Sequence, residues 1–112
     1  MNEIISNRQV VVLQRIQEFG VALEAFIASE YNAKFKNVQA PKIELEVAAK
    51  YVKVVRVEQG NSRSVHSFIV KENGDILKAA GWKAPAKHVR GNVFDDNFSI
   101  GAGVNAYGAR YL

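Results

Sequence analysis

The residues with the clearest chemical potential lie between positions 78 and 92. This segment has no acidic side chain and places five cationic or imidazole groups around a single tryptophan. Cationic side chains can bind phosphates and an indole can stack on a nucleobase, so the combination is typical of single-strand nucleic-acid binding. The candidate binding residues are Lys78, Trp82, Lys83, Lys87, His88 and Arg90.

Charge is unevenly distributed along the 112-residue chain, whose formal net charge is +4. Residues 1–47 carry five basic and six acidic side chains, whereas residues 48–112 carry ten basic and five acidic ones. This asymmetry favours an anionic partner such as DNA or RNA. It is also compatible with a basic surface that only maintains solubility. For Trp82, the alternative to stacking is that the ring covers the core at a strand end.

Other chemistry finds little support. The chain has no cysteine, which excludes disulfides, zinc–thiolate sites and cysteine nucleophiles. His66 falls within a predicted strand, and neither a nucleophile elbow nor a pair of catalytic carboxylates is evident. His88 with Asp95 and Asp96 matches no strong metal signature, and the G-x-G-x-x-A spacing of residues 101–106 lacks a surrounding βαβ unit. We therefore expect no catalytic residues, no metal site and no cofactor.

A long N-terminal helix is predicted over about residues 6–32. Ser6 followed by Gln9 is a capping-box pattern. Apolar residues then recur every three or four positions, at Val12, Leu13, Ile16, Phe19, Leu23, Phe26 and Ile27. The helix would run roughly 40 Å, more than a domain of this size needs. Either it breaks near Gly20 or part of it packs on a second chain, because further apolar residues lie off the main stripe.

A small antiparallel sheet, a meander, is predicted to follow over about residues 43–80. Its strands are residues 43–47, 51–58, 64–71 and 76–80, which alternate or are rich in β-branched residues. A helix followed by about four strands indicates an α+β fold, with the helix packed on the sheet. A strongly bent, Sm-like or barrel-like sheet is compatible with this order, although the strand count is short for closure.

Two turns decide the register of the sheet. Asn73-Gly74 is a strong two-residue hairpin signal, which predicts that Val70 faces Leu77 and Phe68 faces Ala79 on the core side. Lys71 and Lys78 would then point outward. The turn at Gly60-Asn61 needs a longer loop or a bulge, because a two-residue loop would put Lys53 on the face of Phe68.

The rest of the single predicted domain, which spans residues 1–112, has less regular structure. Residues 81–92 are predicted to form a basic, tryptophan-bearing loop. Within it, Pro85 and Gly91 suit the start and end of one or two helical turns over residues 85–90. The glycine-rich tail, residues 93–112, is predicted to be irregular, with a short strand an option at residues 109–112.

One segment resembles a known group of proteins. Residues 73–92, NGDILKAAGWKAPAKHVRGN, are similar to a stretch in small uncharacterised proteins of tailed bacteriophages. The sequences YVKVV at residues 51–55 and SVHSF at residues 64–68 are similar to the same proteins, so the resemblance covers about residues 50–92. It implies a phage origin and the host cytoplasm, and it implies no mechanism.

Two functions of different classes stay open. The first is a small phage-type accessory protein that binds DNA or RNA without sequence specificity through the basic loop. The second is a structural, self-assembling protein that uses the long helix as an oligomer interface. We expect no enzymatic activity. We expect no membrane partner, because no run of about 18 apolar residues occurs. A cytoplasmic location is expected, because residues 1–6 lack the pattern of a secretion signal.

Overall fold

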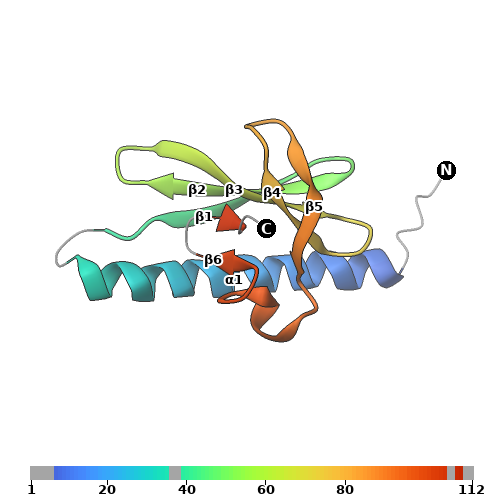
Figure 1. Cartoon of the computed structure of the whole chain (residues 1–112), viewed down its shortest axis with the longest axis horizontal. Coiled ribbons are helices and arrows are strands. Elements are labelled where there is room, and N and C mark those ends of the chain that lie inside the picture. Colours follow the sequence, from blue (N-terminus) through green and yellow to red (C-terminus); the bar gives the residue numbers. More distant parts are fainter. Residues whose placement is uncertain (1–6, 36–38, 106–107, 110–112) are drawn as a thin grey trace.

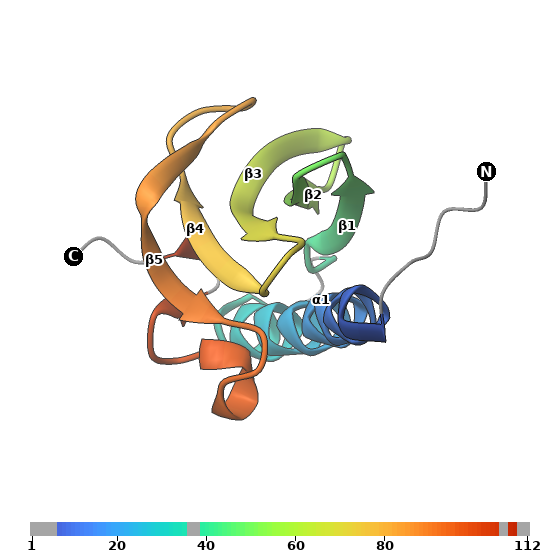
Figure 2. The same cartoon turned by 90° about the vertical axis from the view of Figure 1, so that its right-hand side faces the viewer.

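The computed structural model describes residues 7–35, 39–105 and 108–109. Helix α1 lies beneath a curled antiparallel sheet, as Figures 1 and 2 show. The elements are α1 (Asn7–Lys34), β1 (Lys42–Val47), β2 (Tyr51–Glu58), β3 (Ser62–Val70), β4 (Asp75–Ala79), β5 (Pro85–Asn92), the short 3₁₀ helix η1 (Asp96–Ser99), β6 (Val104–Asn105) and β7 (Gly108–Ala109). The sheet has five strands in the order β1-β2-β3-β4-β5, and β6 pairs with β7. The α+β prediction is confirmed, with five strands in place of about four and an open sheet rather than a closed barrel.

Helix α1 is continuous through Gly20, so the predicted alternative of a break is wrong. A Cβ atom on Gly20 would lie 3.3 Å from Cδ1 of Leu45, which shows how closely β1 approaches the helix there. The backbone N–H of Ile43 donates to Oε1 of Glu24 at 2.8 Å. Gly20 is therefore a packing position, and α1 occupies part of the β1 edge. The capping box predicted at Ser6 lies outside the described residues.

The core forms between one stripe of α1 and one face of the sheet. The predicted helix stripe is confirmed, because its central residues are fully buried. The core cluster contains Val12, Ile16, Phe19, Leu23 and Ile27 from α1, Val52, Val54, Ile69 and Ile76 from the sheet, and Val93, Ile100 and Val104 from the C-terminal segment. The apolar residues off this stripe, Val10, Val11 and Val21, are exposed.

The β3–β4 hairpin corrects one prediction. Phe68 pairs with Leu77 and Ile69 pairs with Ile76, so the register is two residues away from that of a two-residue turn. The side chain of Asn73 accepts a hydrogen bond from the N–H of Asp75 at 2.9 Å, a local bond that favours the longer turn. A slip of two residues leaves the same residues on each face. The prediction of which face is the core side was wrong, however. Ile69 and Ile76 face α1, and Phe68 and Leu77 are buried on the opposite face.

The β2–β3 hairpin has both a longer loop and a bulge, which the sequence analysis gave as alternatives. Glu58 pairs with Ser62 across a turn that is longer than two residues, and a register shift next to Val54 marks a bulge. The two displacements cancel, so Lys53 pairs with Phe68 after all. The prediction of a longer loop or a bulge is confirmed, but its premise that Lys53 must avoid the face of Phe68 is wrong.

Residues 85–90 form part of β5, so the helical turns predicted there are wrong and the loop is confined to residues 80–84. Backbone pairing with β4 decides the outcome, because β4 would otherwise be left with unpaired N–H and C=O groups. Pro85 begins an edge strand, where its missing N–H costs little. The pairing is bulged, with Leu77 opposite Val89 and Ile76 opposite Gly91.

The face of the sheet opposite α1 is called the distal face below. Register and strand alternation place Tyr51, Lys53, Phe68, Leu77 and Val89 on it. The Tyr51 and Phe68 rings meet edge to face, with their centroids 6.1 Å apart. The distal face thus has a small apolar cluster of its own.

The C-terminal segment docks against α1 and β5. Nε of Arg15 donates to the carbonyl of Val93 at 2.5 Å, and its guanidinium lies 3.9 Å from the centroid of the Phe98 ring. A Cβ atom on Gly103 would lie 1.6 Å from the carbonyl oxygen of Arg90, so glycine is required for this close approach. The tail therefore includes a short ribbon, β6–β7, that was predicted to be irregular; most of the strand predicted at residues 109–112 lies outside the described residues.

Candidate nucleic-acid interface

The candidate residues lie on the β4–β5 hairpin, which rises from the sheet on the side away from α1 (Figures 1 and 2). Trp82 and Lys83 occupy the loop, and Lys87, His88 and Arg90 lie in β5. The N–H groups of Ala80 and Gly81 both donate to the carbonyl of Ala84, at 3.0 and 3.1 Å, which closes the loop. The hairpin therefore presents its aromatic and basic side chains on a hydrogen-bonded support.

Trp82 is partly exposed at this tip, with 44% of its surface accessible. Nζ of Lys53 lies 4.3 Å from the centroid of its ring. A cation over an indole face is attracted by the ring quadrupole. Lys53 belongs to β2, so the sheet brings together two residues that are far apart in the sequence. Sequence reasoning missed Lys53 as a site residue. The pairing of Lys53 with Phe68 could have indicated this contact, because it puts Lys53 on the distal face.

Three further polar side chains of the hairpin are accessible from outside. Lys83, Lys87 and His88 are exposed, and none of the three forms an ion pair within the described part of the chain. Such side chains can reach an external phosphate without first breaking an internal contact.

Arg90 and Lys78 are placed less favourably. Nη1 of Arg90 donates to the carbonyl of His88 at 3.3 Å, so its guanidinium turns back on its own strand. Arg90 is half-buried. Lys78 pairs with Ser67, and strand alternation sets it on the face opposite Leu77. Four of the six candidates, Trp82, Lys83, Lys87 and His88, are therefore exposed on the hairpin, whereas Lys78 and Arg90 lie on the same hairpin in half-buried positions.

The two glutamates of β1, Glu44 and Glu46, are paired with basic side chains. Nη1 of Arg63 lies 3.0 Å from Glu44, and its Nη2 lies 2.5 Å from Glu46. Lys53 lies 3.9 Å from Glu46. Exposed pairs of this kind contribute little to stability, but they neutralise the two carboxylates. The β1 side of the distal face is therefore close to neutral.

Comparison with models of known protein families assigns the chain to one of them. A family model matches residues 3–103, which include α1, the whole sheet and the β4–β5 hairpin. The chain belongs to DUF7717, a family of unknown function. Searches of curated proteins and of solved structures found no match. Within the described ranges of this DUF7717 chain, neither helix combines the length and hydropathy needed to cross a membrane.

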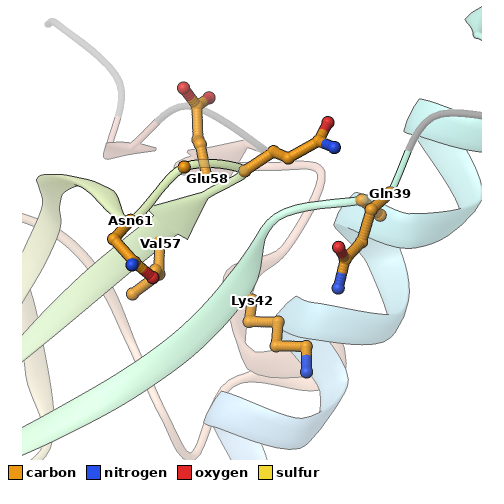
Figure 3. A pocket seen from close by; sticks show the side chains of 8 residues that line it. Gln39, Lys42, Val57, Glu58 and Asn61 are labelled. Carbon is orange, nitrogen blue, oxygen red and sulfur yellow. The ribbon is translucent and has the colours of Figure 1, made fainter.

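A small polar pocket of the DUF7717 chain lies away from the hairpin, beside the β2–β3 turn (Figure 3). Its volume is about 180 Å³, and it is lined by Gln39, Ala40, Lys42, Val57, Glu58, Gln59, Gly60 and Asn61. Lys42 and Glu58 point away from one another, and Glu58 pairs with Arg56 at 3.4 Å. Among the described residues, no group of three or more His, Asp or Glu could hold a metal ion. The pocket contains none of the candidate residues.

His66 is a structural residue in this DUF7717 chain. It is buried, its Nε2 lies 2.7 Å from the carbonyl of Asn105, and its Nδ1 lies 2.9 Å from Oγ of Ser67. A carbonyl can only accept, so Nε2 carries the proton and Nδ1 accepts from the Ser67 hydroxyl. Burial lowers the pKa of His66 from 6.5 to about 4; the bond to Asn105 opposes this shift and the charge of Arg56 adds to it. The neutral ring thus ties β6 to β3.

Proposed function

We propose that this DUF7717 chain binds nucleic acid without sequence specificity through its β4–β5 hairpin, as a small non-enzymatic accessory protein. The observation that carries the proposal is the exposed Trp82, with Lys53 over its ring and Lys83 beside it. The resemblance to small proteins of tailed bacteriophages implies that the protein would act in the cytoplasm of the host.

The chemistry of these side chains supports phosphate contact and base stacking. Lysine ammonium groups act as point charges that neutralise phosphates, whereas arginine is the usual residue for forked contacts to base edges. Arg90 is turned back on its own strand, and a stacking ring tolerates every base because each has a π face. The site therefore offers affinity for the backbone without a means of reading sequence.

Charge removal on the hairpin is expected to reduce both affinity and its salt dependence. In a fluorescence-anisotropy titration with a labelled oligonucleotide, Lys83→Gln and Lys87→Gln should each reduce the slope of log K against log salt by about 1. Lys34→Gln removes an equal charge from the exposed end of α1 and is the matched control, with no change in slope expected. Absence of binding by the unmodified chain at about 50 mM salt would refute the proposal, since phosphate contacts are strong there.

A second candidate is self-association through α1. Val21 is 74% exposed, and it lines a shallow groove with Gln17, Ala22 and Phe98. Burying such a patch between two copies removes apolar surface from water. If this face forms an interface, Val21→Glu should convert a defined oligomer into a monomer in multi-angle light scattering. Asn32→Glu adds the same charge at an exposed position of α1 outside the groove and should leave the oligomer unchanged. A monodisperse monomer before any substitution would exclude this candidate.

A further inference from the structure

We infer that the bound polynucleotide is single-stranded and runs from Trp82 across the distal face to Tyr51 and Lys50. This inference rests on the proposed function and names the form of nucleic acid that the site takes. It also adds two residues to the site, Tyr51 of β2 and Lys50 directly before it. Neither residue belongs to the β4–β5 hairpin.

A second cation–aromatic pair lies on the path. Nζ of Lys50 lies 5.4 Å from the centroid of the Tyr51 ring, as Lys53 lies over Trp82. Tyr51 and Lys53 are alternate residues of β2, so they share the distal face and are about 7 Å apart along the strand. An extended nucleotide backbone repeats over a comparable length. The two pairs can therefore serve neighbouring nucleotides.

The Tyr51 ring is held in place. Phe68 is 3% exposed and meets Tyr51 edge to face, whereas Tyr51 itself is half-buried and retains accessible surface. A ring that is fixed before binding loses little conformational freedom when a base stacks on it. Phe68 therefore acts as a support, and Tyr51 is the side chain left to contact a ligand.

Duplex DNA suits this surface poorly. Paired and stacked bases have both faces covered, so they cannot stack on Tyr51 or Trp82 without leaving the helix. Groove reading commonly uses an inserted helix, and α1 lies on the other side of the sheet. Glu46 lies beside the path, but Lys53 and Arg63 both contact its carboxylate. The distal face therefore favours an unpaired strand.

The inference is tested by comparing labelled oligo(dT), oligo(U) and a mixed-sequence duplex of the same length, all at low salt. We expect single strands to bind at least about 10-fold more tightly than the duplex, with Tyr51→Leu weakening single-strand binding about 5- to 150-fold. Tyr51→Phe keeps the ring and should bind within about two-fold of the unmodified chain. The sugar preference is read from the first two probes, and preference for either supports the inference.

Lys50→Gln provides a second variant if Tyr51→Leu fails to fold, because Lys50 is exposed. It should weaken binding to single strands more than binding to the duplex. Equal affinity for single strands and duplex, with no effect of Lys50→Gln or Tyr51→Leu, would overturn the inference and leave the hairpin proposal standing. Absence of binding to all three probes would overturn both.

Discussion

Replacing Phe19 by alanine is expected to lower the free energy of unfolding by about 3–5 kcal/mol. Phe19 is fully buried at the centre of α1, and its ring meets that of Phe98 edge to face at 6.1 Å between centroids. Truncation removes the largest of the fully buried side chains and leaves a cavity in the core. The helix cannot readily move closer to β1 to fill this cavity, because Gly20 and Leu45 are already in close contact.

The loss at Phe19 is measured by urea unfolding followed by far-UV circular dichroism. Val21→Ala is the matched control, because Val21 is two residues away and largely exposed. Its effect should stay within about 0.5 kcal/mol. A Phe19→Ala variant as stable as the Val21→Ala variant would mean that α1 does not pack on the sheet along this stripe.

Acid is expected to weaken the fold through His66. Its pKa is lowered from 6.5 to about 4 in the folded chain, so the unfolded chain binds more protons between these values. The contribution of the neutral ring is therefore fully present above about pH 6.5 and is lost as the pH falls toward 4, by about 3 kcal/mol in total. Urea unfolding at several pH values in this window measures the loss, and His66→Gln should flatten that part of the profile.

Proton NMR of the histidine rings gives an independent test. The chain has two histidines, and a His88→Gln variant leaves only the His66 signal to follow. That signal should titrate near pH 4, together with changes in the amide signal of Asn105, whose carbonyl accepts from the ring. Titration of His66 near pH 6.5 would show that the ring is not buried against β6.

Much of the fold follows from the sequence, because local signals and packing agree. The stripe from Val12 to Ile27 predicts the helix and its buried side. Alternation and β-branched residues locate β1 to β4. Gly20 was ambiguous, because its value as a contact for Leu45 depends on a strand that lies over it in space. Local propensity alone cannot separate a break from a packing position.

The errors arise where two elements compete or where both faces of the sheet are apolar. Ile69 and Ile76 alternate with Phe68 and Leu77, so either pair could face the helix. Pro85 fits the start of a helix and the start of an edge strand equally well. Pairing with β4 settles this choice, and pairing cannot be read from local sequence.

The arrangement of the candidate residues could be predicted only in part, and their role stays a prediction. Sequence reasoning selected the hairpin with Trp82, but it also included Lys78, which lies on the other face of β4. It missed Lys53, because a longer turn and a bulge in the β2–β3 hairpin had to cancel before that residue could reach the indole. Contacts of this kind depend on register across strands, which one sequence specifies only weakly.

The central claim is that Trp82 contacts nucleic acid, and its fluorescence tests this most directly, since Trp82 is the only tryptophan in the chain. Adding oligo(dT) at about 50 mM salt should quench the emission to a plateau as bases stack on the ring, and further salt should restore it. Emission that stays unchanged with oligo(dT) in large excess would contradict the account.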